Sequence, residues 1–361
     1  MKLIEKVIKE EIKALTRIKD TFDKRYDYLR LDKNERLLPF AKKELARFKK
    51  MIDSDSISGY GELGNLYRRL AAYLGVKDDQ LLLATGSDLA IKSIYEACIT
   101  KGDNVVLHLP CYAMYRVYAK MFGAEVRGVS IKDDWSPDIQ KMLGSVDDKT
   151  KFVCFENPNG FVGTEISIKD IGTCASELNK KDVLLVLDEA YYYIENKKSE
   201  AVGLVKKYPN LIISQTFSKG HGLAGLRMGY LIGDPQLIAY ISRVRPMHEI
   251  TSLTALAAEW VLDNPGMLSG FQRSIGKSKQ YLKKELSKLK IKYKDTHANF
   301  MLLYLPDEGD TKSIALRLRK EGILIRRPFE EAYLKGWSRV CVGSPEDSKA
   351  FISALNKLLK R

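Results

Sequence analysis

The chain has 361 residues, enough for one large or two modest domains around a true hydrophobic core. Lysine and arginine number 60 and aspartate and glutamate number 46, so the formal net charge is +14. Such an excess of positive charge is typical of proteins that bind nucleic acid, an acidic lipid surface or anionic small substrates. The charges are scattered along helical segments such as 279–294, however, which favours solvated helix faces.

Hydropathy and cysteine content exclude further classes of protein. No apolar stretch approaches the length needed to span a membrane, and the N-terminus lacks the apolar core of a signal peptide, so we expect no membrane partner. No two cysteines form a C-x-x-C pair, so we expect no metal site. An odd number of scattered cysteines suits a reducing, cytoplasmic compartment. The five are Cys98, Cys111, Cys154, Cys174 and Cys341.

Residues 1–44 are predicted to form an N-terminal helix and arm. Within 1–20, apolar residues recur as a single helical stripe, formed by Ile4, Val7, Ile8, Ile12, Leu15 and Ile18. We expect this helix to pack on the body of the protein or on a second subunit. Glutamates interrupt its polar face, which disfavours a helix that lies on a membrane surface.

Residues 45–255 alternate between helical patterns and short apolar runs, and we interpret them as a large domain. The helical patterns include 88–98 and 114–123. The runs are rich in β-branched residues and are continuous in apolar character, at 80–86, 104–110, 151–157, 183–189 and 210–216. Strands of this kind, separated by helices, predict an α/β fold: a mostly parallel sheet with helices on both faces.

Residues 256–361 are predicted to form a smaller C-terminal α/β domain. Most of 251–289 has helical spacing. The tail then alternates between predicted strands and helices, at 299–305, 311–322, 323–327, 338–343 and 345–360.

Polar residues follow each apolar run of the large domain at the point where the run ends. Ligands of parallel α/β sheets bind outside the carboxyl ends of the strands, so we expect these side chains to meet at one edge. In chain order they are Gly86, Ser87, Asp88, Tyr112, Asn157, Asp188, Tyr191, Thr216, Ser218, Lys219 and Arg227.

Together these residues match the parts of one molecule. A helix N-terminus at Ser87, with Arg227, suits a phosphate. Tyr112 can lie flat on a heterocycle, and Asp188 can hold a proton on a ring nitrogen. A lysine whose ammonium form is disfavoured by cationic neighbours, as we expect for Lys219, attacks aldehydes.

Two further residues complete that set. Asn157 and Tyr191 can bond a ring oxygen. Phosphate, protonated pyridine, phenolic oxygen and aldehyde together describe pyridoxal 5′-phosphate (PLP). The sequence therefore predicts PLP as cofactor.

The chain resembles the class I/II, fold-type I, PLP-dependent aminotransferases, and within them the histidinol-phosphate aminotransferase branch. The matching segments occur in family order from about residue 31 to residue 357: "LDKNE", "SGYGE", "TGSDLAI", "GDNVVLHLPCYAMY", "NPNG", "LDEAYYY", "TFSKGHGLAGLRMGY", "THANF" and "SRVCVGSPED". The resemblance implies a transaminase, in which an amino group moves from a donor to the cofactor and then to a keto or aldehyde acceptor.

The resemblance also implies roles for single residues. Lys219 would form the covalent imine with the cofactor and move the substrate's proton, and Asp188 would pair with the pyridinium nitrogen. Tyr112 would stack on the ring, and Asn157 and Tyr191 would contact the phenolic oxygen. The implied phosphate cradle consists of Gly86, Ser87, Asp88, Thr216, Ser218 and Arg227.

Three residues carry the implications for subunits and substrate. Tyr60 resembles a tyrosine that reaches the phosphate of the neighbouring subunit, which implies a homodimer with shared active sites. Arg339 resembles the arginine that grips the substrate carboxylate, and Arg326 matches a position that contacts substrate phosphate. Without the resemblance, Tyr60 could be a core tyrosine and the two arginines strand charges.

The chain departs from the family pattern near the substrate. The usual loop N-P-N-N-P-T-G reads "NPNGFVG" here, with Phe161 and Val162 in place of proline and threonine. Asn157, which we also expect to contact the substrate, is kept. The stretches "RVRPMHEITS" and "LDKNERLLP" depart as well. We therefore expect a small anionic amino compound, carrying carboxylate, phosphate or phosphonate, as substrate rather than histidinol phosphate in particular.

Two alternatives remain open at this point. A PLP-dependent decarboxylase of a phosphorylated amino acid would use the same cofactor residues. A non-catalytic basic binding protein is disfavoured because the lysine, aspartate and arginine set is intact. Nucleic acid is not expected as a partner, because no basic tract with interleaved aromatic residues occurs.

Overall fold

The large sheet has seven strands and is parallel except for one of them. The computed structural model describes residues 2–16, 24–195, 198–305, 311–326, 329, 331 and 334–359. The strands are β2 (Leu81–Thr85), β3 (Asn104–Leu109), β4 (Glu125–Ser130), β5 (Thr150–Glu156), β6 (Leu184–Asp188), β7 (Leu211–Thr216) and β8 (Met228–Ile232), in the order β2-β8-β7-β6-β5-β3-β4. Strand β8 runs antiparallel to both neighbours, so β2 again runs parallel to the other five strands.

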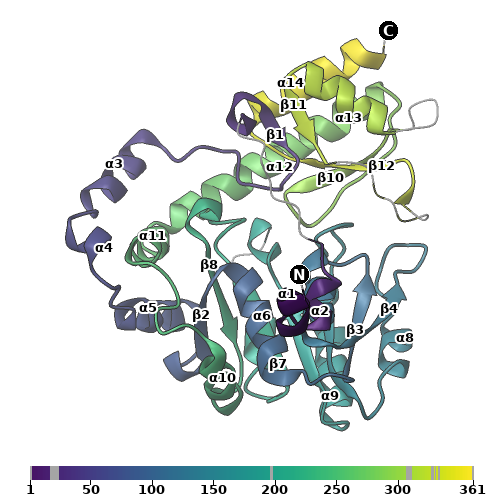
Figure 1. The fold of residues 1–361 in the computed structure, drawn as a ribbon. Coiled ribbons are helices and arrows are strands. Elements are labelled where there is room, and N and C mark those ends of the chain that lie inside the picture. The colour runs from purple at the N-terminus through teal and green to yellow at the C-terminus, as the bar shows by residue number, and fades with distance from the viewer. Residues whose placement is uncertain are drawn as a thin grey trace.

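Successive side chains along each strand belong to two different hydrophobic cores, one on each face of the sheet. Val106 and Val153 belong to a core shared with helix α9, whereas their neighbours Val105 and Phe152 belong to a core shared with α6 and α7. Successive side chains of a strand point to opposite faces, so both faces of the sheet are buried. The predicted α/β architecture, with helices on both faces, is confirmed (Figure 1).

The helices of this part connect the strands or flank the sheet. They are α5 (Gly64–Leu74), α6 (Gly86–Cys98), α7 (Ala113–Phe122), α8 (Ile139–Gly144), α9 (Ile168–Asn179), α10 (Pro235–Ile241) and α11 (Ser252–Leu262). Short 3₁₀ turns are η1 (Arg25–Asp27), η2 (Asp78–Gln80), η3 (Tyr192–Ile194), η4 (Ala201–Leu204), η5 (Ala224–Leu226) and η6 (Ser242–Val244). Among the described residues, no helix is long and apolar enough to cross a lipid bilayer.

A smaller α/β part follows the long helix α12 (Pro265–Lys288), which extends from α11 toward it (Figure 1). Its elements are β9 (Tyr293–Lys294), β10 (Phe300–Tyr304), α13 (Thr311–Lys320), β11 (Ile323–Ile325), β12 (Trp337–Cys341) and α14 (Pro345–Leu359). Strand β10 lies between β12 and β9 and is antiparallel to both. The domain boundaries at residues 44 and 255 stay predictions.

The N-terminal arm joins this smaller part. Strand β1 (Leu29–Leu31) pairs in parallel with β11, and Leu31 lies opposite Ile325. The arm then returns to the large sheet through α3 (Lys42–Lys50) and α4 (Asp55–Ser58). Residues just after β1 are thereby placed between the two parts of the molecule.

The prediction of one helix over residues 1–20 is wrong. The structure has two short helices, α1 (Lys2–Val7) and α2 (Glu10–Lys13), separated at Lys9, which has an extended backbone. The polar side of this segment meets the body, where Glu11 pairs with Lys101 at 2.7 Å. Val7 and Ile12 therefore stay exposed, by 65% and 37%. Ile18 lies outside the described residues.

Candidate active site

Asp188 lies at the carboxyl end of β6, where the sheet is buried on both faces. Its Oδ2 accepts a hydrogen bond from the Tyr115 hydroxyl at 2.9 Å, and its Oδ1 accepts one from the Ala190 N–H at 3.0 Å. Burial raises the pKa of Asp188 to about 6, and these two hydrogen bonds oppose the rise. A buried carboxylate fixed in this way can hold a proton on a ring nitrogen.

Lys219 follows β7 at the same edge of the sheet. Its Nζ donates to the Lys33 carbonyl at 3.2 Å and lies 5.5 Å from the centre of the Tyr191 ring. The predicted pair Lys219 and Tyr191 is thus brought together. The carbonyl of Lys33 comes from the N-terminal arm, so that arm closes one side of the site.

Asn34 is a site residue that the sequence reasoning passed over. Its side-chain Nδ2 donates to the Tyr191 hydroxyl at 3.0 Å, and its backbone has a φ of 53°. Asparagine tolerates this left-handed conformation better than most residues. The segment "LDKNE" is part of the family pattern, and its asparagine, embedded in a polar turn, is the signal that could have identified it.

The predicted phosphate cradle is assembled at the start of α6. The Thr216 hydroxyl donates to the Ser218 Oγ at 3.0 Å, and Arg227 Nη1 also reaches that Oγ, at 3.4 Å. A Cβ atom on Gly86 would lie 2.5 Å from Arg227 Nη2, so the guanidinium fills the space left by the glycine. A helix N-terminus, a guanidinium and hydroxyl groups together suit a phosphate.

Tyr112 and Asp88 lie across this cradle. The Tyr112 hydroxyl donates to Asp88 Oδ1 at 3.4 Å, and the tyrosine is 42% exposed. An exposed ring face near Asp188 suits stacking on a flat heterocycle. Between them, the cradle, the stacking ring, the buried carboxylate and the lysine fit PLP.

Asn157 follows β5 and lies beside the strand end that carries Asp188. Its side-chain oxygen accepts the Ile166 N–H at 2.9 Å, and it borders a cavity of about 200 Å³ together with Glu189 and Tyr192. Its backbone N–H donates to the Asp188 carbonyl at 2.7 Å. The carboxamide that contacts the Tyr191 hydroxyl belongs to Asn34, and contact of the Asn157 side-chain nitrogen with a ring oxygen stays a prediction.

The two predicted substrate arginines differ in burial. Arg339 on β12 is 8% exposed, and its Nη1 donates to the Gly160 carbonyl at 2.5 Å. Its Nε is buried and has no hydrogen-bond partner among the described residues. Arg326 is exposed, and its backbone N–H donates to the Arg339 carbonyl, 3.2 Å away. Arg339 is therefore not a surface strand charge.

Tyr60 is 81% exposed, which excludes its reading as a core residue. Its ring stacks on His248, with centroids 3.9 Å apart. Its role toward a neighbouring subunit stays a prediction.

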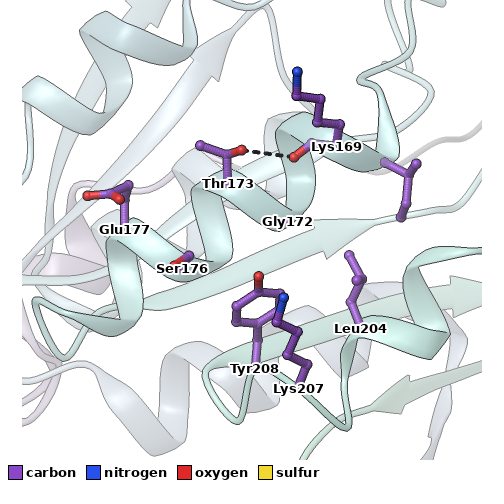
Figure 2. A pocket seen from close by; sticks show the side chains of 9 residues that line it. Lys169, Gly172, Thr173, Ser176, Glu177, Leu204, Lys207 and Tyr208 are labelled. Carbon is purple, nitrogen blue, oxygen red and sulfur yellow. Dashed lines mark hydrogen bonds between the residues drawn. The ribbon is translucent and has the colours of Figure 1, made fainter.

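A larger hollow lies away from this edge. It has a volume of about 500 Å³ and is open to solvent between α9 and the segment that follows η4, with Thr173 on one side and Tyr208 on the other (Figure 2). None of the predicted site residues borders it. We therefore place the active site at the sheet edge and not in this hollow.

Comparison with known proteins agrees with this assignment. Residues 25–355 match the family described as aminotransferase class I and II. Histidinol-phosphate aminotransferase 1 of Carboxydothermus hydrogenoformans is 32% identical over 334 residues, which are 92% of this chain and 93% of that protein. Histidinol-phosphate aminotransferase of Thermoanaerobacter pseudethanolicus is 31% identical over 363 residues, covering 99% and 100%.

Solved structures extend the comparison to the fold. A putative histidinol-phosphate aminotransferase from Erwinia carotovora atroseptica has a TM-score of 0.85 and 26% identity, covering 93% of this chain and 97% of that one. The Sinorhizobium meliloti histidinol-phosphate aminotransferase, solved with pyridoxal-5′-phosphate, has a TM-score of 0.89 at 22% identity, covering 98% of each chain. The chain thus belongs to the class I and II aminotransferases and is a PLP-dependent transaminase.

Proposed function

We propose that this transaminase acts on a small amino compound with an anionic group, and that histidinol phosphate, from the names of its relatives, is the first candidate to test. The observation that carries the proposal is the buried Arg339 guanidinium with its unpartnered Nε among the described residues. A buried arginine with a free donor binds a carboxylate or phosphate strongly, because water does not compete there.

The described side chains suggest a division of work. Bound PLP supplies an electron sink for negative charge at the substrate's α carbon. Lys219 would hold the cofactor covalently, and its Nζ would move the proton of that carbon. Asp188 would keep the ring nitrogen protonated, and Thr216, Ser218 and Arg227 would hold the phosphate.

The loop 157–163 sets the shape of the substrate pocket in this proposal. The Arg339 guanidinium lies 5.8 Å from the centre of the Phe161 ring and 5.3 Å from that of Phe300. Two aromatic walls beside one cation favour a substrate that has an anionic end and a compact apolar or aromatic body.

Attachment of the cofactor is tested by borohydride reduction followed by peptide mapping. A pyridoxyl adduct is expected on the peptide that contains Lys219. An adduct on a different lysine would rule out the proposed role of Lys219.

Substrate class is tested by offering purified enzyme a panel of amino donors and recording bleaching of the bound cofactor's absorbance. Anionic donors, histidinol phosphate among them, should bleach it fastest. Arg339→Lys should raise KM for them about tenfold or more, because lysine lacks the planar fork, while Arg47→Lys, at an exposed position of α3, serves as the matched control. Release of carbon dioxide without need for a keto acceptor would identify a decarboxylase instead.

We also propose a homodimer that works in the cytoplasm. The exposed ring of Tyr60 and the family resemblance support a shared site, and the five unpaired cysteines support a reducing compartment. Sedimentation should give twice the chain mass. Mixing inactive Lys219→Ala with inactive Tyr60→Ala chains should then restore part of the activity, because one of the two sites in a mixed dimer is intact.

A further inference from the structure

Glu156 is a buried carboxyl group at the site for which no role has been given. It ends strand β5 and is only 4% exposed. Its Oε1 accepts the N–H of Tyr112, and its Oε2 accepts the N–H of Gly160 at 2.8 Å. Both partners are neutral N–H groups and neither is a cation. Buried carboxyl groups are costly, so this one needs an explanation.

The two hydrogen bonds tie together groups with separate tasks. Tyr112 offers the ring face for the cofactor. Gly160 receives the Arg339 Nη1 on its carbonyl while its N–H binds Glu156. In the paired strands, Glu156 lies directly opposite Asp188. The Glu156 side chain therefore connects the stacking ring with the substrate loop, and its backbone lies opposite the strand end that carries Asp188.

The glycine at 160 makes this arrangement possible. A Cβ atom there would lie 2.9 Å from Glu156 Oε2 and 3.1 Å from Cε2 of the Tyr191 ring. Both distances are too short for a side chain to fit without displacing one of them. The Glu156 carboxyl thus occupies, beside Tyr191, the space that a side chain at position 160 would take.

The charge state of Glu156 follows from its neighbours. Burial raises its pKa to about 8, with a further rise from Asp188, and the two N–H groups and Arg339 oppose it. Two buried carboxyl groups on neighbouring strand ends do not both ionise readily. The other ionisable groups around it are His108, Cys111, Tyr115, Cys154 and Arg339.

His108, Tyr115 and the two cysteines keep the same charge between pH 7 and pH 9. Burial lowers the pKa of His108 to about 4, so it is neutral above that pH. Burial raises the pKa of Tyr115 and of both thiols well above their usual values. The oxygens of Glu156 can accept the two N–H groups in either charge state, and the ionised form accepts both of them more strongly.

We propose that Glu156 is a positioning residue that holds Tyr112 and the Gly160 loop in place, because each of its two carboxyl oxygens accepts the N–H of one of them. This inference concerns cofactor binding and goes beyond the proposed substrate. Only the link to Arg339 rests on the substrate proposal.

The test measures cofactor binding and so does not depend on the substrate. Cofactor-free protein is titrated with PLP at pH 7, with affinity read from fluorescence and ring orientation from circular dichroism of the bound cofactor. Glu156→Gln has one acceptor oxygen in place of two, and its NH2 group meets one of the two N–H groups, so its affinity should fall about tenfold and its dichroism should change.

Two further variants make the result decisive. Glu156→Asp is one methylene shorter and reaches only one of the two N–H groups, so its affinity at pH 7 should fall about tenfold and its dichroism should change. Glu189→Gln is the matched control: Glu189 is also buried, just after the neighbouring strand β6, but it binds Gln215 and Ser199. It should leave the affinity and the dichroism at pH 7 near native.

Two results would overturn the proposal. One is that the Glu156→Gln and Glu156→Asp variants both bind PLP with native affinity and native dichroism. The other is that the Glu189→Gln control loses as much affinity as they do. If PLP binding behaves as expected but no anionic donor reacts, the substrate proposal fails while this one stands.

Discussion

The side-chain amide of Asn34 donates a hydrogen bond to the hydroxyl of Tyr191 at 3.0 Å and so links the N-terminal arm to the loop after β6. The link is reinforced by Asn299, whose side chain donates to the Asn34 carbonyl at 3.0 Å. The arm is therefore part of the site wall, and Tyr191 is held beside Lys219 from both sides.

We predict that Asn34→Gly lowers kcat/KM about fivefold to tenfold, because a hydrogen bond worth about 1 kcal/mol to Tyr191 is lost. Glycine adopts the left-handed backbone found here without strain, so thermal stability should change little. Steady-state kinetics and a melting curve check both points. Asn34→Asp keeps the shape but cannot donate, and native activity in that variant would contradict the role of the amide.

Gly86→Ala should weaken the phosphate cradle. The new Cβ would lie 2.5 Å from Arg227 Nη2, and the positive φ of 74° costs about 1–3 kcal/mol for a residue with a side chain. PLP affinity should fall about tenfold or more. Affinity for pyridoxal, which lacks the phosphate, should fall much less. Gly144→Ala, where the added Cβ meets nothing within 4 Å, is the control.

Asp188→Asn should remove the charge that holds the ring nitrogen's proton while keeping the shape of the side chain. We expect kcat to fall about 10²-fold or more. Burial raises the pKa of Asp188 to about 6, so its carboxylate is present above that pH and is lost as the pH falls through it. PLP affinity of native protein should therefore decline below pH 6, and the variant should lack this decline. A decline of equal size in both proteins would assign it to another group.

Stability of the cofactor-free protein should fall as the pH rises from about 5 to 8. Burial raises the pKa of Glu156 to about 8, above the ordinary 4.5, so the folded state keeps a proton that the unfolded chain releases in that window. One such group changes the free energy of unfolding by up to about 1.4 kcal/mol per pH unit. Glu156→Gln should flatten the dependence in urea titrations at pH 5, 7 and 9. An unchanged slope would show that the carboxyl is already ionised.

Glu189 should also lower the stability of the cofactor-free protein as the pH rises. Burial raises its pKa to about 7, so Glu189→Gln is expected to flatten the lower half of the window. The double variant should be flatter than either single variant, since the two carboxyl groups make separate hydrogen bonds.

The sheet was predictable because its strands are buried on both faces. Runs such as 104–110 are apolar at most positions, and the structure divides Val105 and Val106 between two cores. Strand β8 was missed because "MGYLI" follows a glycine-rich loop and has no helix before it. The pairing of β1 with β11 joins segments nearly 300 residues apart, and no local pattern specifies such a pairing.

Within the site, the sequence located loops better than side-chain directions. Lys219, Asp188, Tyr191 and the group around Arg227 meet at the expected edge because strand ends fix their positions. The side-chain oxygen of Asn157 accepts the Ile166 N–H, a contact within the loop that residue spacing does not reveal. Glu156 escaped notice for a similar reason, since a carboxyl that ends a strand is usually a solvated one.

The parallel pairing of β1 with β11 has a consequence for how the enzyme matures. A nascent chain emerges from the ribosome with residues 29–31 first, but their partner strand appears only when residues 323–325 have been made. Until then the backbone of Lys33 and the amide of Asn34 have no fixed position, even when the large sheet that carries Lys219 and Asp188 is already complete. Catalytic competence should therefore arrive late in synthesis, and a chain that stops short of residue 323 should carry the cofactor residues without the wall that completes them.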